Sequence, residues 1–222
     1  MAHQHGANAG DHQPQERDPQ KFWENRYAEQ DQIWSGKVNP ILAGIAADLE
    51  VGTALDLGCG EGGDAVWLAG MGWRVTAVDI SRTALERAER AAIERGVDSR
   101  ITFARHDLAA DFPSGEFDLV SAQFLQTPLE FPRARVLQQA ARAVALGGRL
   151  LIVEHGAAPP WMPSDHDHPT YFPTAQQTVD DLELIDDHWR IERQEAKERE
   201  ATGPHGESGI LLDNIILACR LA

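Results

Sequence analysis

Short apolar runs alternate along the chain with longer segments in which apolar residues recur every three to four positions. The short runs are typical of buried strands, and the periodic segments are typical of helices with one apolar face. The pattern predicts strands at residues 53–57, 73–78, 101–104, 117–123 and 149–155, with helices between them that include 81–95 and 132–146. This alternation predicts an open parallel sheet with helices on both faces.

The N-terminal part of the chain departs from this alternation. Residues 1–20 are polar and rich in Gly, Gln and His, so we expect a disordered or loosely docked tail there. Residues 21–50 predict two helices that cap the sheet, the second of which begins with Asn39 as its N-cap and Pro40 in its first position. We therefore expect a single domain over residues 21–222.

The C-terminal part departs from it too. Residues 156–173 form a Pro-rich, aromatic segment whose length is typical of a lid or substrate loop. After a predicted helix at 178–185, residues 189–199 and 209–220 predict an antiparallel strand pair with a turn at 202–206. The expected fold class is α/β: a Rossmann-like seven-stranded sheet, mostly parallel with one antiparallel strand in a C-terminal hairpin, and helices on both faces.

Charge and composition exclude several classes of function. A formal net charge of −15 leaves no basic surface for a phosphate backbone, so we expect no nucleic-acid partner. The chain shows neither an apolar run long enough to cross a bilayer nor a signal-peptide pattern, so we expect no membrane association. Its two cysteines, Cys59 and Cys219, form no C-x-x-C motif, which fits a cytoplasmic protein.

The first predicted strand leads into a glycine-rich turn, Asp56-Leu57-Gly58-Cys59-Gly60-Glu61-Gly62-Gly63. Glycines let the backbone approach a ligand closely, and the N-terminus of the following helix suits a nucleotide-like group or a carboxylate. The turn matches G-x-G-x-x-G, the dinucleotide fingerprint, and it also matches D-x-G-x-G-x-G. The acid of the second pattern, Asp56, is unhelpful beside a pyrophosphate but useful near an ammonium or a sulfonium, and S-adenosylmethionine (AdoMet) carries both.

Polar residues also follow the other predicted strands, and in a parallel sheet these ends meet at one edge. Asp79 ends the second strand about twenty residues beyond the glycines, where an acid can accept hydrogen bonds from both ribose hydroxyls. Asp107 follows the third strand and could accept from an adenine amino group, with Leu108 packing on the ring. Gln123 and His155 end the next two strands.

Together, the acid-and-glycine turn, Asp79, Asp107, the strand 117–123 and the closing strand pair resemble a class I AdoMet-dependent methyltransferase over roughly residues 20–222. The segment 22–40, with Trp23, Arg26-Tyr27 and Trp34-Ser35-Gly36, looks like the N-terminal extension of tellurite-resistance and thiopurine methyltransferases. The resemblance implies AdoMet as cofactor and methyl transfer to a small-molecule acceptor by in-line displacement. It implies a cofactor site of Trp34, Asp56, Gly58, Cys59, Gly60, Asp79, Ile80, Asp107, Leu108, Gln123 and Phe124.

Within that resemblance, Gly58 and Gly60 would line the methionine portion of AdoMet, and the carbonyl of Gln123 would receive its ammonium group. Relatives often carry a histidine after the fourth strand, where this chain has Gln126. The resemblance therefore assigns no acid–base role to Gln126.

Several alternatives stay open at this point. His155 is a candidate general base because the pKa of histidine suits the task. A metal site from His155, His166, His168 and an Asp is conceivable, although we expect no metal. Trp34, Phe124, Trp161 and Tyr171 are candidates for an aromatic acceptor pocket. The competing functions are an NAD(P)-dependent oxidoreductase and a non-catalytic AdoMet-binding protein; the acceptor and the oligomeric state are not predicted.

Overall fold

The computed structural model describes residues 16–162, 171–203 and 206–222 of the chain. Most of the expected tail, the Asp/His-rich stretch that contains His166 and His168, and the tip of the last turn lie outside the described residues. The described helices and strands follow the chain as α1 (Pro19–Ala28), α2 (Pro40–Ala46), β1 (Thr53–Leu57), α3 (Gly63–Gly70), β2 (Arg74–Asp79), α4 (Arg82–Glu94), β3 (Ile101–Arg105), β4 (Phe117–Gln123), α5 (Arg133–Arg142), β5 (Val144–His155), α6 (Ala175–Leu182), β6 (Trp189–Thr202) and β7 (Ser208–Arg220).

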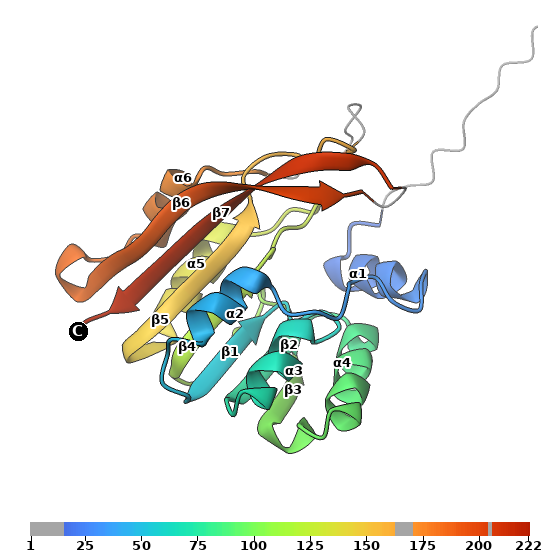
Figure 1. The fold of residues 1–222 in the computed structure, drawn as a ribbon, viewed down its shortest axis with the longest axis horizontal. Helices are drawn as coiled ribbons and strands as arrows, with labels where there is room; N and C mark the ends of the chain where they lie inside the picture. The colour runs from blue at the N-terminus through green and yellow to red at the C-terminus, as the bar shows by residue number, and fades with distance from the viewer. Residues whose placement is uncertain (1–15, 163–170, 204–205) are drawn as a thin grey trace, which may run out of the picture.

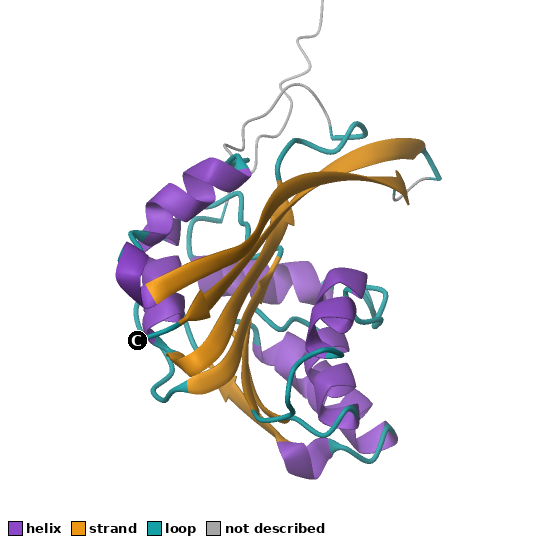
Figure 2. Ribbon diagram, turned by 60° about the vertical axis from the view of Figure 1, so that its left-hand side comes forward, coloured by secondary structure: helices purple, strands orange, loops and turns teal. Residues whose placement is uncertain are grey.

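The described strands form one seven-stranded sheet in the order β3-β2-β1-β4-β5-β7-β6. Strands β1 to β5 are parallel, and β7 pairs antiparallel with both β5 and β6. The sheet twists between helices on its two faces (Figures 1 and 2). Strand order reverses between β1 and β4, and ligands of such sheets bind outside the carboxyl ends of the strands at that point. The expected fold class is confirmed.

An apolar layer on each face of the sheet holds the helices in place. On one face, α2 and α3 pack around Leu42, Leu68 and Trp73. On the other face, α5 and α6 pack around Leu137 and Leu182. Because both faces of the inner strands are covered, β1 and residues 150–153 of β5 are buried and mostly apolar.

Two helix boundaries differ from the prediction. The helix expected at 132–146 ends at Arg142, because Val144 is fully buried and already pairs with Phe117 as the first residue of β5. The helix expected at 178–185 covers Ala175–Leu182 instead. Its start is set by a capping box between Thr174 and Gln177, which satisfies backbone N–H groups that the apolar pattern alone does not reveal.

The C-terminal hairpin is longer than the sheet that it joins. Strand β5 pairs with β7 only from Arg149–Cys219 to His155–Asp213, whereas β6 pairs with β7 as far as Thr202–Ser208. The distal part of the hairpin therefore extends past the carboxyl end of β5, as Figure 1 shows. The outer strand β6 is rich in exposed charged residues, which discourage pairing of this open edge with another sheet.

Candidate active site

The glycine turn after β1 is closely packed from both sides. Gly60 and Gly62 have φ angles of +54° and +83°, in the left-handed region that favours glycine. A Cβ atom on Gly62 would lie 2.7 Å from the Cβ of Ala88, so glycine lets α3 and α4 approach each other here. A Cβ on Gly60 would lie 3.1 Å from the Tyr27 hydroxyl and 3.2 Å from Cδ1 of Trp34. Residues 22–40, called the N-terminal segment below, thus cover the turn through Tyr27 and Trp34.

Asp79 connects the end of β2 to this turn. Its Oδ2 accepts a hydrogen bond from the Gly60 N–H at 2.9 Å, and its Oδ1 accepts from the Ser81 N–H at 2.9 Å. Burial raises the pKa of Asp79, and the backbone hydrogen bonds from Ser81 and Gly60 oppose that rise. The two bonds fix the carboxyl plane at the mouth of the turn, where each oxygen still has a second lone pair.

Among the described acids of the site, Asp56 has a buried carboxyl oxygen without a hydrogen-bond partner. Its side chain is 2% exposed, and its Oδ2 has no hydrogen-bond partner among the described residues. Burial raises the pKa of Asp56 well above its usual range, and the nearby charges of Asp64 and Asp79 raise it further. An unpartnered buried carboxyl oxygen beside a glycine turn favours a cationic or hydrogen-bond-donating ligand.

The neighbouring acid, Asp64, lies in the first turn of α3. Its Oδ1 accepts a hydrogen bond from the Asn39 N–H at 2.6 Å, which ties the start of α2 to α3. Burial raises the pKa of Asp64 to about 6 despite that bond. Asn39 also donates from Nδ2 to Oε1 of Gln123 at 2.8 Å, so the same residue holds the end of β4.

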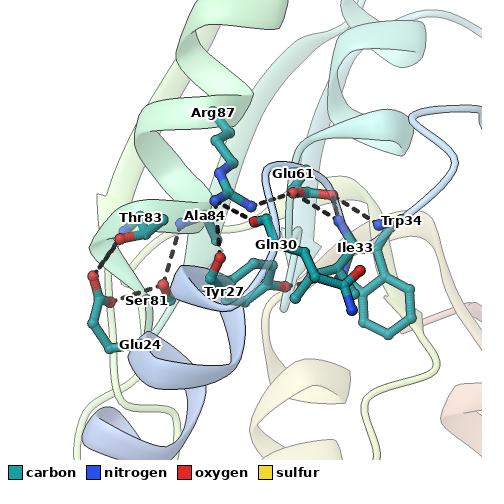
Figure 3. A network of polar contacts seen from close by, with 10 residues as sticks. All are labelled: Glu24, Tyr27, Gln30, Ile33, Trp34, Glu61, Ser81, Thr83, Ala84 and Arg87. Carbon is teal, nitrogen blue, oxygen red and sulfur yellow. Dashed lines mark hydrogen bonds and ion pairs between the residues drawn. The ribbon is translucent and has the colours of Figure 1, made fainter.

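A buried ion pair fastens the N-terminal segment over the turn (Figure 3). Arg87 of α4 donates to Glu61 at 2.8 Å and to the carbonyl oxygens of Tyr27 at 2.8 Å and Gln30 at 2.7 Å. Glu61, which belongs to the glycine turn, accepts in addition from the Trp34 N–H at 2.8 Å and from the Ile33 N–H. One Arg–Glu pair therefore joins the segment, the turn and α4.

Two further contacts complete this attachment. Glu24 of α1 accepts from the hydroxyls of Ser81 at 2.8 Å and Thr83 at 2.6 Å, so it binds the N-terminus of α4 just after Asp79 (Figure 3). The Trp34 indole N–H donates to the Tyr27 hydroxyl at 3.0 Å. Trp34 remains 49% exposed, so its ring lies beside the turn with a face open to solvent or to a ligand.

The predicted adenine-binding residues follow β3. Asp107 is half-buried, and its Oδ1 accepts from the Ala109 N–H at 3.0 Å within its own turn. Leu108 is buried in the apolar layer that contains α5. Ile80 is half-buried directly after Asp79, and its carbonyl accepts from Arg105. These residues lie at the correct edge of the sheet, and their contact with adenine stays a prediction.

Cys59 is held within the turn as a small side chain. Burial raises the pKa of the Cys59 thiol well above its usual value, and the charges of Asp79 and Asp56 add to that effect. The thiol is therefore protonated at neutral pH, which disfavours a nucleophilic role.

The residues after β4 meet the end of β5. Phe124 has a φ of +52°, a left-handed conformation that costs a non-glycine residue energy and often marks a functional site. Its ring lies 4.5 Å from the ring of His155, centroid to centroid. The His155 Nδ1 lies 2.9 Å from Oδ1 of Asp213 on β7. Asp213 was not singled out in the sequence, although an acid inside the apolar run 209–219 was a signal for it.

The proposed aromatic pocket is only partly brought together. Trp161 packs against the distal hairpin, where Cβ atoms on Gly203 and Gly209 would lie 2.8 Å and 3.1 Å from its ring. Tyr171 is exposed, and its carbonyl accepts from Gln126 at 3.2 Å. Of these four aromatic residues, Phe124 is the one whose ring packs on the ring of His155 in the described part of the chain. Among the described residues, no group of three or more His, Cys, Asp or Glu side chains is arranged to hold a metal ion.

Comparisons with known proteins identify the family of the chain. Residues 54–148 match the family model described as a methyltransferase domain. The chain is 32% identical over 162 residues to the 2-heptyl-1-hydroxyquinolin-4(1H)-one methyltransferase of Mycobacteroides abscessus, an alignment that covers 69% of each chain.

The chain is a class I AdoMet-dependent methyltransferase. The family predicted from the glycine turn and the closing strands is thereby confirmed, and AdoMet is its cofactor. This membership favours the methyl-transfer hypothesis over the nicotinamide alternative.

Other relatives of this methyltransferase match shorter parts of it. It is 32% identical over 134 residues to the 27-O-demethylrifamycin SV methyltransferase of Amycolatopsis mediterranei, covering 59% of this chain and 48% of that one. It is 34% identical over 113 residues to the thiopurine S-methyltransferase of Pseudomonas putida, covering 49% and 50%. The chain thus spans about half the length of these two relatives.

Solved structures share the fold over nearly the whole chain. One, from work on the conversion of a disulfide bond into a thioacetal group during echinomycin biosynthesis, has a TM-score of 0.70 at 26% identity and covers 90% of this chain and 91% of that one. TehB from Haemophilus influenzae has a TM-score of 0.68 at 17% identity, covering 89% and 66%. In the described part of the chain, no helix is long and apolar enough to cross a bilayer.

Proposed function

We propose that this methyltransferase transfers the methyl group of AdoMet to a small-molecule acceptor by in-line displacement. The names of three relatives support a small acceptor, since they specify a hydroxyquinolone, a rifamycin and thiopurines. A net charge of −15 disfavours a nucleic acid as substrate. The free cysteines Cys59 and Cys219 support a reducing, cytoplasmic setting.

The observation that carries this proposal is the unpartnered Oδ2 of Asp56, buried beside the glycine turn. A sulfonium or ammonium group at the turn would satisfy this oxygen and would favour the ionised acid. Asp79, held by the Gly60 and Ser81 amides, is oriented to accept from ribose hydroxyls. The remaining proposed contacts to the cofactor are Trp34, Gly58, Cys59, Gly60, Ile80, Asp107, Leu108, Gln123 and Phe124.

AdoMet supplies a methyl group that is already activated by its bond to a sulfonium. The protein therefore has mainly to align the reacting atoms and to exclude water, and orientation can contribute on the order of 7–11 kcal/mol. The N-terminal segment, held by Arg87 and Glu61, closes one side of the turn. The strained Phe124 and the ring of His155 border the end of β4, where the acceptor would approach.

The proposal is tested by isotope-labelled methyl transfer. We expect the protein, given AdoMet with a labelled methyl group and 2-heptyl-1-hydroxyquinolin-4(1H)-one or a bacterial metabolite extract, to yield a labelled small-molecule product, detected by mass spectrometry. The heat-denatured protein is the control. Binding of AdoMet without any labelled product would instead support the non-catalytic alternative.

A further inference from the structure

The main chain of His155 is held by the side chain of Gln126. The His155 N–H donates to Oε1 of Gln126 at 2.8 Å, and Nε2 of Gln126 donates back to the His155 carbonyl at 3.1 Å. The amide thus pairs with His155 as a neighbouring strand would. This pairing joins the segment after β4 to the last residue of β5.

The imidazole ring of His155 is held by two other side chains. Phe124 packs on it with an interplanar angle of 36°. Asp213 lies directly opposite His155 in the antiparallel β5–β7 pair, and its Oδ1 lies 2.9 Å from Nδ1. The Asp213 side chain is 7% exposed and that of His155 is 26% exposed. The ring therefore has one defined orientation and is still partly exposed at the carboxyl end of β5.

The hydrogen bond to Asp213 determines which imidazole nitrogen carries the proton. Burial alone would raise the pKa of Asp213, but hydrogen bonds from His155 and Arg199 outweigh it and lower that pKa. Asp213 is thus a carboxylate and can only accept, so neutral His155 carries its proton on Nδ1. Its Nε2 then has a lone pair, and no described residue donates to that nitrogen.

The charged residues around the ring come from the hairpin. Arg199 of β6 donates to Oδ2 of Asp213, and its guanidinium carbon lies 6.0 Å from the centroid of the Phe124 ring. Lys197 is directly opposite Asp213 in the β6–β7 pair. Arg199 keeps Asp213 ionised and occupies its second oxygen, which leaves Oδ1 for the imidazole.

We infer that His155 and Asp213 form a general-base dyad for an acceptor that carries a hydroxyl group, an inference that rests on the proposed function. The hydroxyl oxygen forms a bond to the methyl carbon while the bond from that carbon to sulfur breaks and leaves its electron pair on sulfur. The hydroxyl proton moves to Nε2 of His155, and Asp213 stabilises the resulting imidazolium. The imidazolium then releases its proton to water. Asp213 and Gln126 are positioning residues, since they act through His155.

The dyad also narrows the acceptor class. An acceptor that is already ionised, or a neutral amine, needs no base before methyl transfer, whereas a neutral hydroxyl is a weak nucleophile until its proton is removed. A positioned imidazole–carboxylate pair would be superfluous for the first kind of acceptor. We therefore place a neutral hydroxyl next to Nε2.

Nitrogen NMR of the imidazole tests the dyad without any acceptor. With ¹⁵N-labelled histidine and bound S-adenosylhomocysteine at pH 8, we expect Nδ1 of His155 to be protonated and Nε2 to be unprotonated. His155→Gln identifies the signal, and Asp213→Asn should lose the preference for Nδ1–H. A wild-type ring that is protonated on Nε2, or that exchanges between both forms, overturns the inference.

Kinetics with a phenol as probe, whose hydroxyl group is neutral near pH 7, test the base itself. We expect His155→Gln to lower kcat by about 10²- to 10⁴-fold and to remove the acidic limb of the kcat/KM pH profile, because general-base catalysis contributes that much. Asp213→Asn should lower kcat at least about tenfold with little change in KM, because it disturbs the tautomer, and Asp213→Glu should restore part of the rate. Gln substitution of His188, an exposed histidine, is the matched control.

Unchanged kcat and pH profile in His155→Gln would contradict the dyad. Calorimetry with S-adenosylhomocysteine separates this result from failure of the proposed function. If the wild-type chain binds it and the variants bind it equally well, only the base assignment is at stake. If the wild-type chain does not bind it, the proposed function itself is wrong.

Discussion

At the residue scale, several buried carboxyl groups lie close together around the glycine turn. Asp56, Asp64 and Asp79 surround the glycine turn, and burial raises the pKa of each. Uncompensated, such a cluster takes up protons rather than holding three negative charges. A cation seated at the turn would reverse this, since it favours the ionised acids.

This cluster predicts that AdoMet binding releases protons. The pKa of Asp64 is about 6, raised from 3.8. Because the folded protein favours the protonated Asp64 carboxyl, this group stabilises the fold fully below its unfolded pKa of 3.8. That stabilisation is lost as pH rises through about 6. AdoMet affinity should therefore increase as pH rises from about 5 to 7, with proton release measured by calorimetry in buffers of different ionisation enthalpy.

Two variants make that measurement specific. Asp64→Asn should reduce the proton release near pH 6, whereas Asp48→Asn, at an exposed site on the surface, should leave it unchanged. If wild-type protein binds AdoMet with no net proton release between pH 5 and 7, the cluster does not couple to the cofactor.

At the element scale, an ion pair between α4 and the glycine turn holds the N-terminal segment. Arg87 of α4 and Glu61 of the turn are 14% and 6% exposed in their side chains, and together they bind the main chain from Tyr27 to Trp34. Loss of one partner would leave the other charge buried and unpaired. The covering of the glycine turn therefore depends on this pair.

Arg87→Met is predicted to weaken binding of S-adenosylhomocysteine by roughly tenfold or more, which corresponds to about 1.4 kcal/mol. Hydrogen exchange at the Ile33 and Trp34 amides should accelerate, because Glu61 would no longer be held beneath them. The matched control is Arg82→Met on the same helix, whose ion pair with Glu86 is exposed on the surface. Equal affinities in the two variants would show that the segment does not contribute to the cofactor site.

Some bounds of the helices and strands could be predicted from the sequence, and others could not. Strands with continuous apolar runs, such as 53–57 and 149–155, were predictable because both of their faces are buried. The early end of α5 was not, because Val144 suits the apolar side of a helix and only its pairing with Phe117 places it in β5. Helix caps depend in the same way on side-chain bonds that periodicity does not report.

The positions of some residues of the candidate site could likewise be predicted from the sequence, and those of others could not. The positions of Asp56 and Asp79 could be predicted, because each lies near the carboxyl end of a strand whose neighbours in the sheet follow from the topology. The partner of His155 could not, because Asp213 lies 58 residues further on and meets it only through the register of the β5–β7 pair. The strained backbone of Phe124 and the use of Gln126 as a strand mimic are likewise tertiary effects.

At the scale of the whole molecule, the parts of the candidate site lie together at the carboxyl ends of the parallel strands. The glycine turn, the acids, the N-terminal segment and the end of β5 converge there, and the long hairpin extends past it (Figure 1). An AdoMet-dependent methyltransferase needs a cofactor site and an acceptor site at the same place, and we propose that both lie where these features converge. Cofactor binding at the turn is therefore the central claim.

Isothermal titration calorimetry with S-adenosylhomocysteine tests that claim most directly. We predict one binding site per chain, no measurable heat with NAD, and at least about a hundredfold loss of affinity in Asp79→Ala, since removing a buried acceptor of charge-assisted hydrogen bonds is costly. Asp48→Ala is the control. Binding of NAD in place of S-adenosylhomocysteine, or unchanged affinity in Asp79→Ala, would contradict the account.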